Sequence, residues 1–363
     1  MARLGDVGKV ITGNTPKTSD AQNYKSNDIC FVKPSDIVDG AVTYLSDSEF
    51  YISEYARTKA RVLPPKSVLV TCIGIIGKVA INNVECAFNQ QINAIIPDKS
   101  KASVEYLAYA IQYKQAEMQD IANAPVVPIL NKTQFSDIEI KLPDLTEQAE
   151  IIGRLNAISN LIALRKEQLA KLDELVKARF VELFGDPITN SNNLPTEQME
   201  QRFNLKAGIT TAADDIHDFA EGVYEIPCYG GNGIRGYVKE KSYTGDYPII
   251  GRQGALCGNV QYATGDFHAT EHAVLVSLLK NDNSVWVYHL LKLMDLYRYH
   301  TGAAQPGLAV KTLNTVEVIV TDKSKQDQFA AFVEQTDKSK LAIQQSLDKL
   351  EILKKSLMQK YFG

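Results

Sequence analysis

The sequence predicts an α+β fold. We expect two mixed α/β globular domains separated by two long helices that pair as an antiparallel coiled coil, with a pseudo-two-fold internal repeat. Residues 128–185 align without a gap onto residues 306–363, at a constant offset of 178. In each half several short β-type runs precede one helical pattern, an order typical of α+β proteins. Each half then closes on a long heptad pattern.

The repeat divides the chain into four segments. Its two copies end alike, with Phe184-Gly185 matching Phe362-Gly363. A repeat of this length is a repeated domain rather than a solenoid unit. We therefore expect globular domains at residues 1–143 and 186–321 and spacer helices at residues 144–185 and 322–363.

Short apolar runs predict the strands of both globular domains. In the first domain they are residues 28–32, 67–71, 78–81 and 91–96, and in the second they are residues 248–251, 258–262 and 272–276. A helical pattern follows in each domain, over residues 104–119 and 285–299. Ser103 is a suitable N-cap for the first of these helices, and Ser284 takes its place in the second.

The long helices carry the clearest pattern. Thr146 is a suitable N-cap for the first. Apolar residues then recur every seven positions, and we assign them to heptad position a: Leu155, Ile162, Leu169, Val176 and Leu183. The second helix carries its apolar residues mainly at position d: Ile343, Leu350 and Leu357. In an antiparallel pair a positions face d positions, so the two patterns complement each other.

This pairing predicts Leu172 near Leu347. It also places Arg165 and Arg179 on the seam near lysines, where they must extend outward or meet carboxylates. The alternative is two independent amphipathic helices that lie on other proteins.

Bulk composition limits the class of protein. The chain has 363 residues, 45% of them apolar, which suits two or three ordinary domains. Its five cysteines form an odd set without a CxxC pair and favour a reducing compartment. The start lacks the apolar core of a signal peptide, and no apolar stretch is long enough to span a bilayer. We expect a cytoplasmic protein.

Charge is spread without a strongly basic segment. The formal net charge is −4, and segment 186–321 alone carries −5. Strong non-specific nucleic-acid binding by the chain alone is therefore not expected. A DNA-binding function would need local clusters of basic residues, or partner proteins that supply the rest.

Motifs for catalysis are missing. The run Gly74-Ile-Ile-Gly77-Lys78 lacks P-loop spacing, and neither a dinucleotide fingerprint nor an amino-methyltransferase element is present. His268-Ala-Thr-Glu271-His272 fits H-x-x-E-H, but it runs into a strand-like segment, whereas zinc-protease chemistry needs both histidines on one helix face. We expect no metal site, and we keep a zinc hydrolase only as a third hypothesis.

Glycine-rich polar loops recur in both halves and favour recognition. Glycine lets a backbone approach a ligand closely, and Lys, Arg, Asn and Gln contact phosphates or base edges. The alternative for each loop is a hairpin turn on an ordinary sheet. The candidate DNA-binding residues are Lys33, Gly74, Gly77, Lys78, Asn89 and Gln90 in the first half, and Tyr229, Asn232, Arg235, Arg252 and Gln253 in the second.

Over its whole length the chain resembles the specificity subunits of type I restriction–modification enzymes. Residues 141–148 and 177–187 are similar to the central conserved region of that family. Residues 74–80 with Asn89-Gln90, and residues 229–237 with 251–254, are similar to its target recognition domains. The Lys-Leu-Pro-Asp signature is degraded to Ile-Val-Thr-Asp in the second copy, and the chain begins directly at the first recognition segment.

The resemblance implies a function without catalysis by this chain. Each recognition domain would read one half of a split, asymmetric site in double-stranded DNA. Two methyltransferase subunits would dock along the helices, and motor-nuclease subunits would add restriction. AdoMet, ATP and Mg would be cofactors of those partners only, and this chain would hold none. The chief alternative is a scaffold that uses its twin domains to bind protein without DNA recognition.

Overall fold

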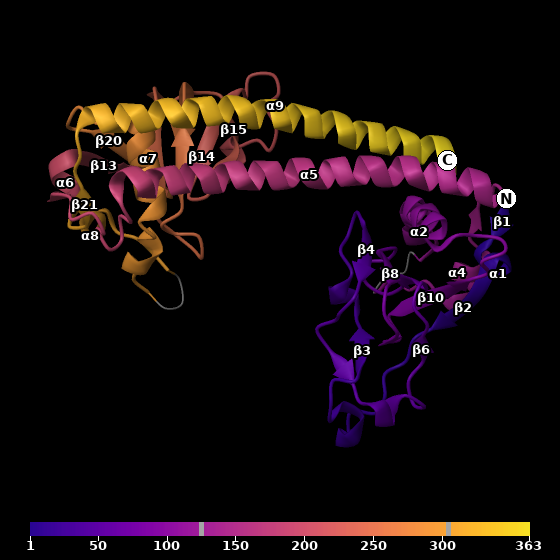
Figure 1. The fold of residues 1–363 in the computed structure, drawn as a ribbon. Coiled ribbons are helices and arrows are strands. Elements are labelled where there is room, and N and C mark those ends of the chain that lie inside the picture. The colour runs from indigo at the N-terminus through magenta and orange to yellow at the C-terminus, as the bar shows by residue number, and fades with distance from the viewer. Residues whose placement is uncertain (123–126, 303–305) are drawn as a thin grey trace. The chain divides into compact units, whose positions relative to one another are not determined.

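The computed structural model describes residues 1–122, 127–302 and 306–363, and these form two units (Figure 1). Unit 1 comprises Met1–Leu164 and Ser346–Gly363, and unit 2 comprises Arg165–Gln345. The long helices α5 (Leu145–Phe184) and α9 (Lys323–Phe362) have 40 residues each. Each of them contributes one segment to unit 1 and one segment to unit 2. Each unit therefore holds one globular body and two helical segments.

Unit 1 is built on two sheets of order β2-β10-β7-β8-β4 and β5-β3-β9-β6. Its strands are β1 (Ala2–Arg3), β2 (Gly8–Thr12), β3 (Ile29–Val32), β4 (Val42–Leu45), β5 (Tyr51–Ile52), β6 (Val62–Leu63), β7 (Val68–Thr71), β8 (Val79–Asn82), β9 (Cys86–Phe88), β10 (Ile92–Pro97) and β11 (Glu139–Ile140). Its shorter helices are α1 (Leu4–Val7), α2 (Val104–Tyr113), α3 (Gln115–Ile121) and α4 (Lys132–Asp137). The strand β10 lies between β2 and β7 and is antiparallel to both.

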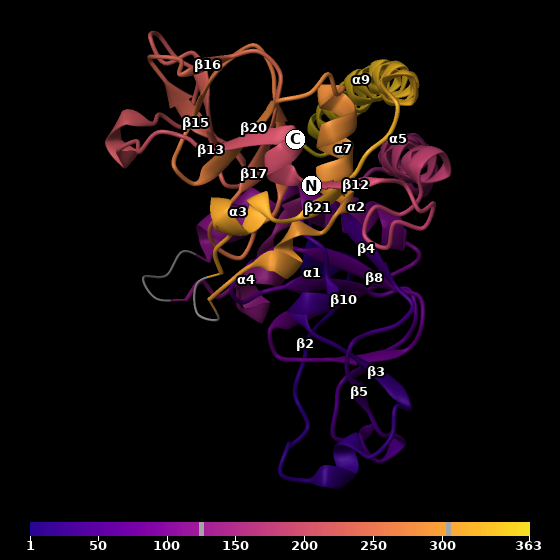
Figure 2. The same cartoon turned by 90° about the vertical axis from the view of Figure 1, so that its left-hand side faces the viewer.

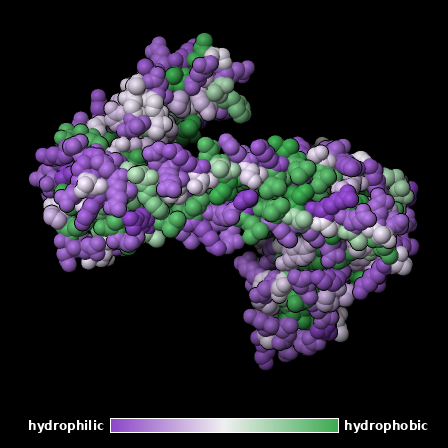
Figure 3. All heavy atoms as spheres, turned by 45° about the horizontal axis from the view of Figure 1, so that its top comes forward, coloured by the Kyte–Doolittle hydropathy of each residue, from purple (hydrophilic) through white to green (hydrophobic). Residues whose placement is uncertain are grey.

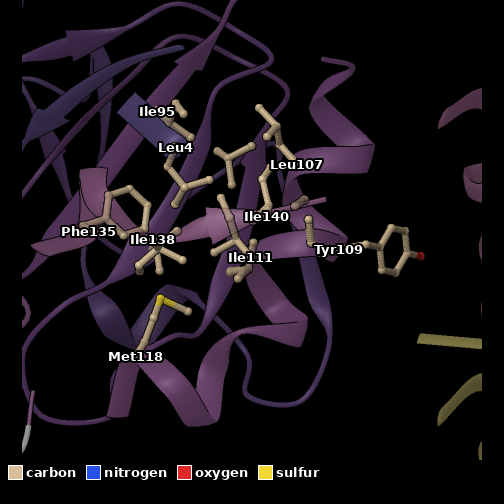
Figure 4. Close-up of a cluster of buried hydrophobic side chains, with 14 of the residues drawn as sticks. Leu4, Ile95, Leu107, Tyr109, Ile111, Met118, Phe135, Ile138 and Ile140 are labelled. Atoms are coloured by element: carbon tan, nitrogen blue, oxygen red, sulfur yellow. The ribbon is translucent and has the colours of Figure 1, made fainter. Parts of the chain in front are cut away.

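The main core of unit 1 lies between the five-stranded sheet and α2. Figure 4 shows Leu107 and Ile111 of α2 pointing toward Ile95 of β10 and Leu4 of α1, and all four are fully buried. The long helices join this core through Ile151 and Leu155 of α5 and through Met358 and Phe362 of α9. Burial of each such side chain contributes about 1.5–3 kcal/mol, so the helical segments are firmly anchored to the body.

Unit 2 repeats this plan with sheets of order β13-β20-β17-β18 and β15-β14-β19-β16. Its strands are β12 (Thr196–Gln198), β13 (Phe203–Ala207), β14 (Ile226–Gly230), β15 (Gly233–Val238), β16 (Tyr243–Thr244), β17 (Tyr247–Gly251), β18 (Val260–Ala263), β19 (Asp266–Ala269), β20 (Ala273–Leu278) and β21 (Glu317–Ile319). Its shorter helices are α6 (Met199–Arg202), α7 (Ser284–Leu293) and α8 (Val310–Asn314), and α7 lies against the first of the two sheets (Figure 2).

An aromatic cluster forms the core of unit 2. Phe180 and Phe184 of α5 contact Trp286 of α7 and Phe329 of α9, with ring centroids 4.9–6.4 Å apart. All four side chains are fully buried. The cluster joins both long helices to the globular body of this unit.

The long helices run antiparallel within each unit. In unit 2, Phe180 of α5 meets Phe329, whereas Asp173, two turns earlier, binds Lys340 at 2.6 Å. In unit 1, Arg154 of α5 binds the hydroxyl of Tyr361, near the end of α9, at 3.0 Å. The predicted antiparallel pairing is thus confirmed in each unit.

The seam arginines and the predicted leucine contact have different outcomes. Arg179 meets the carboxylate of Glu182 at 2.7 Å, which is one of the two solutions expected for a charged group on the seam. Arg165 binds Gln168 on its own helix. The predicted approach of Leu172 and Leu347 joins residues of different units, so it stays a prediction.

Two helix starts differ from the sequence prediction. The N-terminus of α5 is capped by Asp144, whose carboxylate accepts from Glu147 N at 2.9 Å, and Thr146 lies inside the helix. The N-cap of α7 is Asn283, so Ser284 is the first helical residue instead. In both cases a second capping residue stands one or two positions earlier, and its side chain makes the bond. Ser103 caps α2 as predicted.

The two predicted shorter helices are also broken. Residues 104–119 form α2 and α3, which are separated at Lys114 with a ψ of 8°. Residues 285–299 form α7 and a short 3-10 turn, Leu296–Tyr299. There the break falls at Asp295, whose left-handed φ of 49° cannot continue an α-helix.

Candidate nucleic-acid interface

In unit 1 the loops that carry the predicted residues meet at one edge of the sheets. β7 ends at Thr71, which pairs with Ile92 at the start of β10. Gly13, directly after β2, donates its N–H to Ile92 O at 3.0 Å, and Cys72 N donates to Gln91 O at 2.8 Å. The loops after β2, between β7 and β8, and between β9 and β10 therefore lie side by side. We call this edge reading edge 1.

Glycines shape the loop between β7 and β8. Gly74 and Gly77 have φ of +77° and +85°, a region that favours glycine. A Cβ on Gly77 would lie 2.7 Å from Gln115, whereas Gly74 is exposed with open space around it. Lys78 follows, and its Nζ lies 3.4 Å from Pro34 O. The backbone of the loop is thus presented to solvent beside a lysine.

Lys33 stands next to Pro34 and so lies close to Lys78. Its ammonium sits 3.0 Å from the centroid of the Phe50 ring. Neither lysine forms a salt bridge in the part of the chain that the structure describes. Two positive charges therefore flank this side of reading edge 1.

Asn89 and Gln90 occupy the neighbouring loop but differ in orientation. Asn89 is buried, and its amide exchanges hydrogen bonds with Gln91 at 3.0 and 3.1 Å. Gln90 is exposed, and its Oε1 accepts from Thr15 Oγ1 at 2.6 Å. Gln90 therefore presents its amide at the surface, whereas Asn89 holds the loop in shape.

Unit 2 builds an equivalent edge from its own strand ends. Gly208, directly after β13, donates to Ala273 O at 2.9 Å, and Arg252 N, after β17, donates to His272 O at 3.0 Å. The turn between β14 and β15 joins them, because Asn259 donates to the side chain of Asn232. We call this edge reading edge 2.

Four of the five residues predicted in unit 2 lie at or beside this edge with polar groups near the surface. Asn232, Arg235 and Gln253 are exposed, and Arg252 is half-buried. Tyr229 differs: its half-buried ring packs against the buried ring of Phe267, with centroids 5.7 Å apart, at the margin of the core between the two sheets. The run at residues 228–237 is a β-hairpin, which was the alternative interpretation of this run.

At each reading edge, a glycine that we did not include among the candidate residues lets two backbone segments lie in close contact. A Cβ on Gly13 would lie 2.0 Å from Asn89 O, and one on Gly208 would lie 2.2 Å from Ala269 O. Each glycine follows the second strand of its unit, β2 or β13, so the two are equivalent. Both approaches join segments far apart in the sequence, which is why local patterns could not identify them.

The His268–His272 motif lies on the end of a strand and the following turn, not on one face of a helix. His268 lies on the strand β19, and its Nε2 is 2.8 Å from Thr211 Oγ1. Burial lowers the pKa of His268. Within the described ranges no group of His, Cys, Asp and Glu is placed to hold a metal ion. The predicted strand that follows the motif is β20, and Glu271 and His272 lie in the turn before it.

The loop after β2 lies beside an ion pair. Lys59 binds the carboxylate of Asp20 at 2.8 Å, and this hydrogen bond lowers the pKa of Asp20. Lys59 also lies 3.7 Å from the Tyr55 ring centroid, and its main-chain oxygen accepts from Asn14. The loop after β2 is thereby tied to a basic and aromatic neighbour.

Comparison with known proteins now places the fold in a family. The family model for the type I restriction modification DNA specificity domain matches residues 1–174 and 203–352. The chain belongs to this specificity family. Both matched stretches include a globular body and part of a long helix, in agreement with the repeat.

Individual relatives agree with this membership. The chain is 31% identical over 362 residues to the type I restriction enzyme EcoprrI specificity subunit of Escherichia coli, covering 92% of this chain and 86% of that protein. It is 29% identical over 207 residues to the MjaIX specificity subunit of Methanocaldococcus jannaschii, covering 55% of this chain and 48% of that protein. The crystal structure of a type I S subunit from M. genitalium has the same fold, with a TM-score of 0.61 at 15% identity, covering 99% and 95% of the two chains.

No helix within residues 1–122, 127–302 and 306–363 is both long and apolar enough to cross a membrane.

Proposed function

We propose that this specificity-family chain reads a double-stranded DNA site in two separate parts, one at each reading edge. The observation that carries the proposal is the duplication of the edge itself. Gly13 and Gly208 make equivalent close backbone contacts with the loops that face them. Basic and amide side chains surround each edge. Side chains of these types make the phosphate and base-edge contacts of DNA-binding proteins.

The spacer helices suit a split site. An α-helix rises about 1.5 Å per residue, so 40 residues span about 60 Å. One turn of DNA is about 34–36 Å long, so a spacer of this length suits half-sites about one to two turns apart. Each half-site would be read independently, because each unit has its own core and its own edge.

Methyltransferase subunits are the partners we propose for the helices. Several large apolar side chains on the helices are exposed by 44–70%: Leu161, Leu164, Leu175, Leu341, Ile352 and Leu353. Figure 3 shows apolar patches among the hydrophilic surface, including along the long helices. Exposed patches of this kind are typical of protein–protein contacts. Two methyltransferase subunits, and motor-nuclease subunits where restriction is added, would cover them.

Catalysis is proposed to reside in those partners. The sequence lacks motor, methyl-transfer and nuclease motifs, and AdoMet, ATP and Mg would be bound by the partner subunits. The mild acidity of the chain is then acceptable, because the partners would supply much of the contact with the DNA backbone. We propose a cytoplasmic location, because the odd set of five cysteines without a CxxC pair favours a reducing compartment.

The test is DNA methylation with and without a methyltransferase partner. We expect adenine methylation at one split DNA sequence when both are present, and none with the chain alone. Methylation by the chain alone would contradict the absence of catalysis. A partner complex that methylates no defined sequence would contradict DNA reading and favour the protein-binding scaffold.

A further inference from the structure

Two fully buried glutamines occupy equivalent positions in units 1 and 2, each at the start of a long helix. Gln148 lies in the first turn of α5 and Gln326 in the first turn of α9, and both side chains are 0% exposed. They are separated by the repeat offset of 178. Buried polar side chains are expensive unless they are hydrogen-bonded, so their bonds are informative.

In unit 1, Gln148 joins three segments. Its Oε1 accepts from Ser103 N at 2.9 Å, and its Nε2 donates to Lys101 O at 2.8 Å and to Pro143 O at 2.9 Å. Ser103 is the N-cap of α2, and Lys101 belongs to the turn between β10 and α2. One amide therefore ties the start of α5 to the segment that connects β10 to α2.

In unit 2, Gln326 makes the same three connections. Its Oε1 accepts from Asn283 N at 2.7 Å, and its Nε2 donates to Asp282 Oδ1 at 2.8 Å and to Thr321 O at 3.1 Å. Asn283 is the N-cap of α7, as Ser103 is of α2. The one difference is that a carboxylate replaces a main-chain carbonyl, and Arg202 neutralises it through a buried ion pair.

Each glutamine uses one acceptor and two donors, which fixes the orientation of the amide in all directions. The bonded turn directly follows an inner strand of the sheet, β10 in unit 1 and β20 in unit 2. In unit 1, β10 runs from the loop with Asn89 and Gln90 to this turn, and in unit 2, β20 runs from Glu271 and His272 to the equivalent turn. A strand of six residues spans about 20 Å. A small rotation at the glutamine would therefore displace the reading edge.

We propose that Gln148 and Gln326 are positioning residues that set the angle of each reading edge on its spacer helix. Through that angle they fix the number of base pairs tolerated between the two half-sites. This inference rests on the proposed function. One base pair corresponds to about 3.4 Å and about 35° of helical rotation in DNA, so a loosened edge would accept neighbouring gap lengths.

We call the number of base pairs between the two half-sites the gap. The preferred gap shows whether a glutamine positions the reading edge or only stabilises the fold. A glutamine that only stabilised the fold would change the amount of active complex without altering which gap it prefers. A base-reading residue would change the base accepted at one position without altering the gap. Only a positioning residue would relax the gap and leave both half-site sequences intact.

The experiment uses the full chain in complex with its methyltransferase subunits. A plasmid library presents both half-sites with gaps from two base pairs shorter to two longer than the wild-type gap, and methylation is read by sequencing. The variants are Gln148→Ala and Gln326→Ala, together with Gln148→Glu and Gln326→Glu, which retain the acceptor and remove the donors. Gln168→Ala and Gln335→Ala are matched controls, because both are exposed glutamines on the same helices.

We expect the alanine variants to lower the preference for the wild-type gap over neighbouring gaps by about three- to tenfold, the size expected for one or two lost buried hydrogen bonds. The glutamate variants should show the same effect, and the controls should show none. An unchanged gap preference in the glutamine variants that methylate DNA would overturn the inference, as would a change in the bases accepted. Absence of split-site methylation by the wild-type complex would instead overturn the proposed function.

Discussion

Arg202 and Asp282 form a buried ion pair in unit 2, with side chains 9% and 2% exposed. A charge in such a place is tolerated only while its partner is present. The guanidinium Nε also donates to Asp282 at 3.0 Å, and Glu197 lies 3.3 Å away at the rim. At the scale of single residues, this pair fixes the turn that Gln326 holds.

We predict that Asp282→Ala lowers the free energy of unfolding by about 3–5 kcal/mol, because it removes the buried carboxylate beside Arg202 and leaves only the more exposed Glu197 as a partner. Trp286 is the single tryptophan of the chain and is fully buried in unit 2, so its fluorescence during urea unfolding reports this change. Glu334→Ala, which removes an exposed pair with Lys338, is the control and should leave the midpoint nearly unchanged. Equal effects of the two changes would contradict the assignment.

His289 gives unit 2 a pH dependence with a defined sign. Burial, aided by Lys292 and Lys340, lowers its pKa to about 4, and Asp173 opposes this shift. The unfolded chain, with an ordinary histidine pKa near 6.5, therefore binds more protons between these values. Stability is fully present above about pH 6.5 and falls as the pH drops toward 4.

We expect the wild-type chain to lose about 1–2 kcal/mol of stability from this group between pH 7 and pH 5. His289→Gln should lack this loss, because glutamine does not titrate. Urea unfolding followed at Trp286 at both pH values measures the difference. A variant that loses as much stability as the wild type would show that another group is responsible.

Sequence patterns at the scale of elements worked where the signal is local. The strands β3, β7, β8 and β10 were predicted within one or two residues, because buried apolar runs stand between turn residues. The predicted N-caps of α5 and α7 were wrong because Asp144 and Asn283 stand beside Thr146 and Ser284, and residues of all these types cap helices well. The second sheet of each unit could not be predicted in full, since the parallel pair β14–β19 joins segments about forty residues apart in chain order.

The candidate site divides in the same way. Glycine-rich loops with Lys78 or Arg252 were visible in the sequence, and both lie at reading edges. The burial of Asn89 and the packing of Tyr229 against Phe267 could not be predicted, because they depend on which loop or sheet each side chain meets. The roles of Gln148 and Gln326 could not be predicted either, since most of their hydrogen-bond partners are main-chain atoms of turns far away in the sequence.

At the element scale, Phe180 should carry much of the attachment of α5 to unit 2. It is fully buried among aromatic rings, so Phe180→Ala should lower the free energy of unfolding by about 3–5 kcal/mol. Leu175 on the same helix is 48% exposed, and Leu175→Ala should change stability little. A small effect at Phe180, measured by Trp286 fluorescence, would contradict the packing described for this helix.

The exposed leucines should instead affect assembly. We predict that Leu161→Asp with Leu164→Asp weakens capture of the methyltransferase subunit, because a charge replaces apolar contact area at the proposed surface. Co-purification of tagged methyltransferase measures this effect. The matched change Lys166→Asp alters a polar residue on the same helix and should be tolerated. Full capture by the double variant would place the docking surface elsewhere.

At the scale of the whole molecule, two units of one plan share two continuous helices, and their charges differ. Segment 186–321 carries −5, whereas residues 1–143 are close to neutral. We therefore expect the two half-sites to depend differently on the partner subunits for contact with the DNA backbone.

Lys78→Ala should weaken methylation of all sequences alike and reduce the salt dependence of binding by about one phosphate contact.

Independent reading by the two units is the central claim, and sequencing of DNA methylation tests it most directly. Cells would express the methyltransferase with the wild-type chain, with Lys78→Ala and Gln90→Ala, or with Arg252→Ala and Gln253→Ala. The account predicts one split sequence for the wild type. The first pair of changes should alter recognition or occupancy through one half-site only, and the second pair through the other. A base-reading change should relax one position, at about 1–3 kcal/mol. Equal disturbance of both half-sites by either pair, or no effect of both pairs, would contradict it.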